Sequence, residues 1–283
     1  MSLCAPTAGL TCFGCCPPIR PARYDHLDFV GSLKREFLEN RRRYLEEGPR
    51  YRPIVGYHCW ALGFLDSQGR RIGCLLHPYM NNGQDLRFLI DYGNKCRREN
   101  CLPARMYARL PLEGQRFWLP LAEGLNAFHF SSHRANPLFH LLLWGPEVLE
   151  PLRAQAERIG LTPTEVLHLH PFLLDTTWNP RSRRYLLRKL LNLLSSEALN
   201  SGHLRDCAQK LWSRVRALPE IQTIQASGSM SSQNSYTHQL PMEVDYLDFV
   251  RVGLGCMKAP LQTAFELEAR IRQVVLDIAE KEF

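Results

Sequence analysis

The sequence predicts an α+β protein: a small cysteine-rich domain with a β-hairpin, residues 1–125, followed by a mainly α-helical domain, residues 126–283. Three observations predict this fold class. Eight of the ten cysteines lie within the first 101 residues. Two apolar runs flank the turn-forming residues 66–69. Beyond about residue 135, apolar residues recur at helical spacing between residues that typically cap helices.

The first domain is expected to contain one long helix and one hairpin. Apolar residues at helical spacing in "HLDFVGSLKREFLENRRRYLEE", residues 26–47, predict an amphipathic helix that stops at Gly48-Pro49. The segment "YHCWALGFLDSQGRRIGCLLHP", residues 57–78, predicts a hairpin. Pairing across its turn would bring Cys59 and Cys74 within a residue or two of facing each other. Residues 112–121 are expected to add a short strand.

The second domain carries several helix signals. Residues 145–160 predict a helix that a glycine ends, and Thr162 and Glu165 have the spacing of a capping box. Asn179-Pro180 predicts the start of a leucine-rich helix. Residues 222–241 are rich in Ser and Gln and are expected to form a mobile loop, after which an amphipathic helix closes the chain.

The cellular compartment of the protein decides whether its cysteines are expected to form disulfides or to bind metal. The stretch "MSLCAPTAGLTCFG" has neither the basic start nor the apolar run of a signal peptide. Uninterrupted apolar runs of about 18 residues are also absent from the sequence. We therefore expect a soluble, cytoplasmic protein that has no membrane partner. Thiols stay reduced in that compartment, so clustered cysteines indicate metal ligation in preference to disulfides.

The cysteine spacing suggests which metal is bound. Cys12 and Cys15 form a C-x2-C pair, and Cys96 and Cys101 form a C-x4-C pair. The adjacent Cys16 and the two hairpin cysteines fit a simple zinc knuckle less well, whereas iron-sulfur clusters accept irregular ligand spacing. The pattern favours an iron-sulfur cluster, with [4Fe-4S] preferred, over zinc. The remaining alternative is a set of buried structural thiols.

The order of these motifs resembles a known family. C-x2-C-C at 12–16, a cysteine before "FLD" at 59–66, "GCLLHP" at 73–78 and a Cys-Arg pair at 96–97 resemble the zinc- or iron-chelating cysteine domain, which also occurs in proteins similar to flagellin lysine methylases. The resemblance covers residues 12–101, and residues 79–95 are an insertion relative to it. The chelating set that it implies is Cys12, Cys15, Cys16, Cys59, Cys74, Cys96 and Cys101.

Two further side chains stand beside this implied set. Cys4 lies outside the family pattern, and His77 follows Cys74 at a spacing that suits a ligand. Whether either one binds metal stays open on the sequence alone. No methylase activity is carried over from the resemblance, because the second half of the chain resembles no family.

The net charge of +7 raises the question of nucleic acid. Residues 1–125 hold 18 Lys and Arg against 12 Asp and Glu, so most of the excess accompanies the cysteines. Four thiolates around a divalent ion carry about two negative charges, which such an excess offsets. Two basic stripes, residues 41–44 and 181–189, are the candidates for phosphate contacts, but each also fits a solvated helix face. We expect no nucleic-acid partner.

Known catalytic motifs do not occur in the sequence. It contains no P-loop, dinucleotide fingerprint, Ser-His-Asp order or HExxH motif, so no catalytic residue and no substrate are identified. The expected function is that of a metal-cysteine protein whose cluster has a redox, sensing or catalytic role. Its helical half would hold a protein partner or a small-molecule substrate. The alternatives are a structural-zinc module for protein interaction and, third, a nucleic-acid-binding zinc protein.

Overall fold

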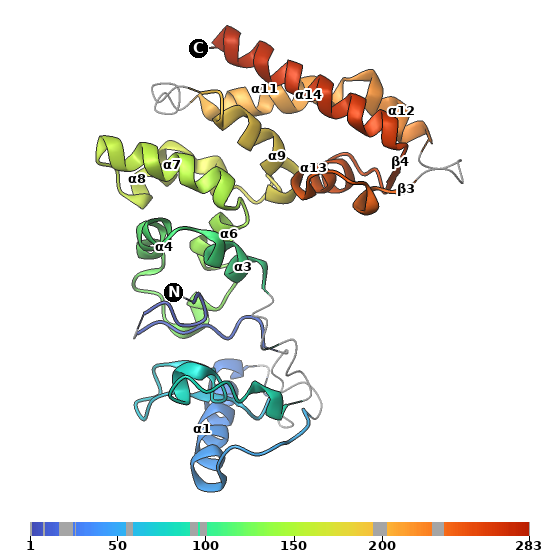
Figure 1. The fold of residues 1–283 in the computed structure, drawn as a ribbon. Helices are drawn as coiled ribbons and strands as arrows, with labels where there is room; N and C mark the ends of the chain where they lie inside the picture. The colour runs from blue at the N-terminus through green and yellow to red at the C-terminus, as the bar shows by residue number, and fades with distance from the viewer. Residues whose placement is uncertain are drawn as a thin grey trace. The chain divides into compact units, whose positions relative to one another are not determined.

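The computed structural model describes residues 2–7, 9–16, 25, 27–54, 59–90, 96, 101–194, 203–227 and 235–282. The chain forms two compact units, Met1–His140 and Leu141–Phe283, whereas the sequence suggested a boundary after residue 125 (Figure 1). Taken together, the described residues are mostly helical, and each unit contains a small antiparallel sheet of two strands.

The first unit combines one long helix, one hairpin and several short helices. Its elements are α1 (Phe29–Glu47), β1 (Leu62–Phe64), β2 (Ile72–Cys74), the 3-10 helices η1 (Pro78–Met80) and η2 (Arg87–Leu89), α3 (Leu102–Arg109), α4 (Leu112–Trp118), the 3-10 helix η3 (Leu119–Ala122), α5 (Ala127–Phe130) and α6 (Pro137–Leu142). Helix α6 continues across the boundary into the second unit.

Helix α1 confirms the predicted amphipathic helix and packs on the hairpin. Its first turn is capped by the Asp28 carboxylate, which accepts a hydrogen bond from the Gly31 amide at 3.1 Å. Leu33 and Phe37 are buried against β1 as the spacing predicted. Two apolar residues with the same spacing are not buried: Leu27 is 99% exposed because it precedes the cap, and Val30 in the first turn is 47% exposed.

The predicted hairpin is present, but its register differs from the expectation. Cys74 pairs with Leu62, and Cys59 lies three residues before that partner, so the two cysteines do not face each other across the ladder. A turn joins Cys59 to β1, where the Leu62 amide donates to the Cys59 carbonyl at 3.0 Å. The Asp66 carboxylate accepts three backbone N–H groups of the connecting loop and so fixes the hairpin turn.

The strand expected at residues 112–121 is wrong, because this segment forms α4 and η3. The helix begins directly after Pro111, and Gln115 and Trp118 are buried three residues apart on one face. That helical spacing decides against a strand, in which residues three apart point to opposite faces.

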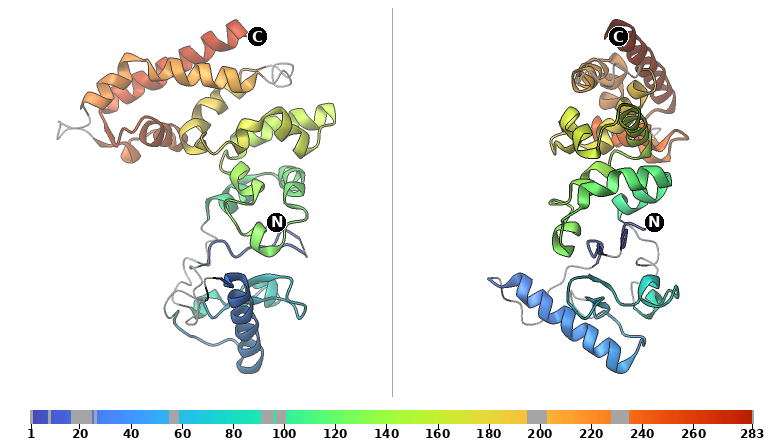
Figure 2. Two further views of the ribbon diagram at one scale, coloured as in Figure 1. Left: turned by 180° about the vertical axis from the view of Figure 1, so that it is seen from behind. Right: turned by 90° about the vertical axis from the view of Figure 1, so that its left-hand side faces the viewer.

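The second unit is a set of packed helices. Its elements are α7 (Pro146–Ile159), α8 (Pro163–Leu169), the 3-10 helix η4 (Pro171–Leu174), α9 (Pro180–Leu191), α11 (Leu204–Arg216), α12 (Pro219–Ser227), β3 (Ser235–Tyr236), the 3-10 helix η5 (Thr237–Gln239), α13 (Val244–Asp248), a π-helix η6 (Phe249–Gly253), β4 (Lys258–Ala259) and α14 (Leu261–Glu282). Figure 2 shows α14 alongside α11 and α12.

Helix boundaries in this unit follow the predicted signals. Gly160 ends α7 in the left-handed conformation with φ 74°, and the capping box of Thr162 and Glu165 starts α8. Asn179 caps α9. The expected loop at 222–241 is largely replaced, because α12 extends to Ser227 and residues 235–239 form β3 and η5. Its centre, residues 228–234, lies outside the described residues.

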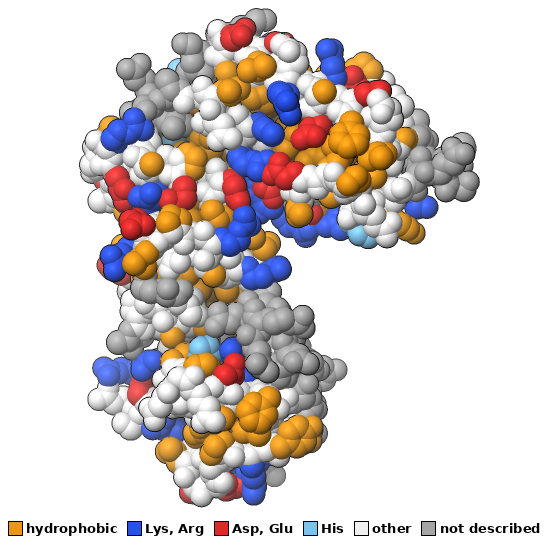
Figure 3. Space-filling model, in the orientation of Figure 1, with side chains coloured by type: hydrophobic (Ala, Val, Ile, Leu, Met, Phe, Trp, Pro, Cys, Tyr) orange, Lys and Arg blue, Asp and Glu red, His pale blue; other side chains and the backbone are white. Residues whose placement is uncertain are grey.

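Acidic partners hold three of the five basic residues of α9. Arg181 binds Asp248 at 2.8 Å, and Arg184 and Arg188 form ion pairs with Asp245 and Glu243. On the face drawn in Figure 3, Lys and Arg side chains of the second unit are interleaved with Asp and Glu. Among the described residues, no helix has the length and apolar character needed to cross a membrane.

Candidate functional site

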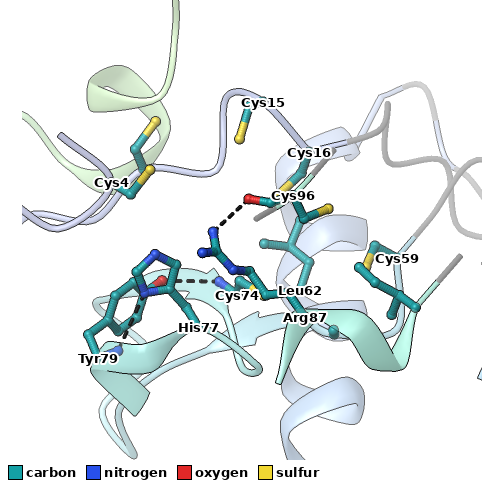
Figure 4. A pocket seen from close by; sticks show the side chains of 13 residues that line it. Cys4, Cys15, Cys16, Cys59, Leu62, Cys74, His77, Tyr79, Arg87 and Cys96 are labelled. Atoms are coloured by element: carbon teal, nitrogen blue, oxygen red, sulfur yellow. Dashed lines mark hydrogen bonds between the residues drawn. The ribbon is translucent and has the colours of Figure 1, made fainter. Parts of the chain in front are cut away.

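A cavity of about 60 Å³ in the first unit gathers most of the cysteines. By the usual allowance of roughly 15 Å³ for each water molecule, it has room for about four waters, which is more than a single metal ion needs. Figure 4 shows the side chains around this common space. The lining cysteines are Cys4, Cys12, Cys15, Cys16, Cys59, Cys74 and Cys96.

The N-terminal segment brings four of these cysteines to the cavity. Its backbone is held by the buried Thr11 side chain, which accepts a hydrogen bond from the Ile72 amide of β2 at 3.1 Å. The Phe13 amide donates to the Ser131 hydroxyl at 2.9 Å. A Cβ on Gly14 would lie 2.5 Å from the Ser131 carbonyl oxygen, so the turn of the C-x2-C motif requires glycine there.

Within that turn, sulfur already accepts a backbone hydrogen bond. The Gly14 amide donates to Cys12 Sγ at 3.3 Å, and the Cys16 amide closes the turn on the Phe13 carbonyl at 3.0 Å. Hydrogen bonds to sulfur stabilise the thiolate form and tune metal-thiolate centres. The local geometry of this motif is therefore suited to a thiolate ligand.

The other lining cysteines belong to the apolar core. Cys59 is part of the cluster of buried residues around Phe37, and Cys16, Cys74 and Cys96 pack against that cluster. Four thiols thus share a region with low water access, in which a thiolate needs a partner of opposite charge.

Burial keeps these thiols protonated when no metal is bound. It raises the pKa of Cys12 and of Cys74 to about 12 and the pKa of Cys59 to about 11. Neighbouring thiols contribute to each of these shifts, since Cys12 is affected by Cys15 and Cys101, and Cys74 by Cys59 and Cys96. The cysteines are near enough to one another for their charges to interact.

Three side chains that are not cysteines complete the polar part of the lining. His77 caps η1, where its Nδ1 accepts from the Tyr79 amide at 3.4 Å, and its ring stacks on Tyr79 at 4.1 Å. The Tyr79 hydroxyl accepts a hydrogen bond from the Cys74 amide at 3.2 Å. The Arg87 guanidinium reaches into the middle of the group of cysteines (Figure 4).

The remaining cysteines lie elsewhere. Cys101 does not line the cavity, and its Sγ caps α3 by accepting from the Ala104 amide at 3.4 Å, although it is near enough to Cys12 to raise the pKa of that thiol. Cys207 and Cys256 are buried in the second unit, as expected for small apolar residues. All ten cysteines carry thiols.

The donor set fits a metal centre, but the sulfur atoms are not in ligand geometry. Among the described residues, no three His, Cys, Asp or Glu side chains stand close enough together to hold a metal ion. Protonated thiols have no electrostatic reason to converge, whereas thiolates do so around a cation. The chemistry of the lining, soft sulfur donors in an apolar setting, suits zinc or an iron-sulfur cluster.

Sequence reasoning left Cys4 open and did not identify Tyr79 and Arg87 as residues of this site. Cys4 was left outside the pattern because no spacing rule includes it, but its carbonyl accepts from the Cys12 amide at 2.9 Å, and this pairing brings it to the cavity. Tyr79 and Arg87 carry no signal of a metal site in the sequence. Both lie within 13 residues after Cys74, in a segment of tight turns. The tertiary structure places this segment beside the cysteines, which the spacing of residues in the sequence does not indicate.

Comparison with known proteins adds no relative. No family model, curated protein or solved structure matches this chain. The resemblance to the zinc- or iron-chelating cysteine domain therefore remains an expectation from the motif order, and the chemistry of the site is argued from its own residues.

Proposed function

We propose that the chain is a cytoplasmic metal-cysteine protein that binds an iron-sulfur cluster in the first unit. The observation that carries this proposal is the convergence of seven cysteines, from four separate segments, on one cavity. A zinc ion and a [4Fe-4S] cluster each take four ligands, so the number of cysteines does not separate them, whereas a cavity of about 60 Å³ exceeds the space that a single ion needs. A polynuclear cluster uses cysteines from distant segments and fills a larger space.

The role proposed for the cluster is redox, sensing or catalytic, with the helical second unit binding a protein partner or a small-molecule substrate. Hydrogen bonds to sulfur, such as that from the Gly14 amide, are among the features that set the potential of a cluster. Zinc is the second candidate, because the C-x2-C turn of Cys12 and Cys15 alone suits a zinc site.

Purification of the full chain without oxygen tests the proposal. We expect a brown protein with visible absorption, and we expect analysis to find iron and acid-labile sulfide in comparable amounts. A colourless protein with stoichiometric zinc would establish the second candidate. A protein that holds neither metal after growth with both supplied would overturn the proposal.

A further inference from the structure

Arg87 is a buried arginine with a fixed orientation. Its residue is 7% exposed, and its guanidinium forms a two-point ion pair with Asp85, in which Nε and Nη2 each donate to a carboxylate oxygen at 3.0 Å. Nη1 donates to the Cys96 carbonyl at 2.6 Å. The backbone amide of Arg87 also binds the Asp85 carboxylate, which fixes the turn from which the side chain starts.

This arginine differs from the other residues around the cavity in its charge. Among the described residues of the lining, Arg87 alone is charged at neutral pH whatever its surroundings, because a guanidinium does not lose its proton in proteins. The Arg87 guanidinium faces the sulfur atoms (Figure 4), while its partner Asp85 lies outside the lining.

Thiolate ligands in this setting need such a charge. Four thiolates around a divalent ion leave about two negative charges, and a buried charge without compensation is strongly destabilising. The hydrogen bond of Arg87 to the Cys96 carbonyl also holds the backbone of one lining cysteine in place.

We propose that Arg87 is the resident counter-ion and positioning residue of the cysteine site. Its guanidinium compensates the thiolates of the metal-bound state and orients Cys96 through the backbone. This inference rests on the proposed metal site. It adds a residue from the segment 79–95, which the family pattern does not contain.

The test compares the full chain with the variants Arg87→Gln, Arg87→Lys and Arg52→Gln. Arg52 is the matched control because it too is an inward-packed arginine of the first unit, paired with Glu47 and stacked on Trp60 at 5.3 Å, but it does not line the cavity. Each protein is purified without oxygen, its metal is quantified, and the release of that metal to EDTA is followed over time.

We expect Arg87→Gln to lose its metal at least ten times faster than the unchanged chain, since loss of a residue that supports metal ligands typically costs about 10–100-fold in affinity. Arg87→Lys keeps the charge without the planar guanidinium, so its rate of metal release should lie between those of the unchanged chain and Arg87→Gln. Arg52→Gln should match the unchanged chain. Equal release rates for Arg87→Gln and Arg52→Gln, or no rescue by lysine, would overturn the inference.

A second measurement separates a charge effect from a loss of structure. If the metal is iron, removal of a positive charge beside the cluster disfavours its reduced form. The equilibrium constant for one-electron reduction should fall about tenfold in Arg87→Gln, which corresponds to a decrease of about 59 mV in the midpoint potential. An unchanged midpoint potential would show that Arg87 stabilises the fold without acting on the cluster through its charge. Absence of metal from the unchanged chain itself would instead refute the metal site, and the role of Arg87 with it.

Discussion

The side-chain amide of Asn40 on α1 donates a hydrogen bond of 2.9 Å to the carbonyl of Leu62 on β1. Asn40 is 4% exposed, and the same amide lies 3.4 Å from the carbonyl of Cys59. One buried polar group on the helix thus holds both the first residue of the hairpin and a cysteine of the cavity.

Replacement of Asn40 by Ala should therefore destabilise the first unit. The Leu62 carbonyl loses its side-chain donor, whereas the Cys59 carbonyl keeps the Leu62 amide, and the loss of a buried donor costs about 1–3 kcal/mol in the free energy of unfolding. Chemical denaturation of the full chain measures it, with the exposed Lys34→Ala on the same helix as control. If both variants unfold at the same denaturant concentration, the Asn40 bond does not contribute to stability.

A pair of glycines allows the close packing beside the cavity. Gly63 and Gly73 face each other across the hairpin, and a Cβ on Gly73 would lie 2.4 Å from the Tyr79 hydroxyl. Gly73→Ala should displace the Tyr79 ring from the cavity and cost about 1–3 kcal/mol in stability through overpacking. Metal retention and thermal unfolding measure the two effects.

Gly9→Ala provides the control for that substitution, because a Cβ there meets no atom within 4 Å. It should leave both metal retention and the unfolding temperature unchanged. A Gly73→Ala protein that behaves like Gly9→Ala would mean that Tyr79 can move without cost to the site.

How much of this fold was predictable varies with the range of the interaction. The helix at Phe29–Glu47 and the capping box at Thr162 depend on residues a few positions apart, and the sequence shows them directly. The hairpin was predictable, but its register was not, because the choice of Cys74 opposite Leu62 depends on packing against α1. The helix at Leu112–Trp118 was missed because its aromatic and leucine content also suits a strand.

The candidate site shows the same division. Six of the seven cysteines that the resemblance implied line the cavity, and the other, Cys101, caps α3. Cys4 and Arg87 could not be assigned to the site from the sequence. The position of Cys4 depends on the backbone hydrogen bond with Cys12, and that of Arg87 depends on the turn that the Asp85 carboxylate fixes. Tertiary contacts of this kind do not produce a residue spacing that can be recognised in the sequence.

Substitution of single cysteines should separate ligands from bystanders. Cys12→Ser, Cys59→Ser and Cys74→Ser should each lower the bound metal steeply, and we now expect Cys4→Ser to lower it as well, since Cys4 lines the cavity. Cys207→Ser is the control, because Cys207 is buried in the second unit. Full metal content in Cys4→Ser would show that this cysteine lies beside the site without binding.

Metal binding should release protons at neutral pH. The pKa of Cys12, Cys59 and Cys74 lies at about 11 to 12, so these thiols hold their protons throughout the range below pH 9 when no metal is present. Each one that becomes a ligand must lose its proton, and the apparent affinity should therefore rise with pH, by up to tenfold per pH unit for each proton released.

A pH indicator in weak buffer measures this release when Zn²⁺ is added to the metal-free full chain. The Cys74→Ser variant should release about one proton fewer per chain than the unchanged protein. Binding without any proton release would mean that the metal is held by groups other than these thiols.

The basic helix face at residues 41–43 should not bind nucleic acid. Arg42 and Arg43 form ion pairs with Glu39 at 2.8 Å and 2.7 Å, whereas Arg41 points inward and donates to the Phe64 carbonyl at 3.0 Å. The double change of Arg42 and Arg43 to Gln should thus leave metal content and stability nearly unchanged, because exposed ion pairs contribute little. Arg41→Gln should instead lower stability by about 1 kcal/mol, the usual value of one hydrogen bond.

Gel-shift titrations of DNA and RNA at two salt concentrations test the same point directly. If the cations of the first unit mainly compensate thiolates and carboxylates, the metal-loaded chain should bind only weakly, and the loss of Arg42 and Arg43 should change nothing. Phosphate contacts would instead give submicromolar binding that falls steeply as salt rises and weakens with each arginine removed. That result would favour the third candidate, a nucleic-acid-binding zinc protein, over the iron-sulfur protein, because the arginines would then contact phosphate in addition to Glu39.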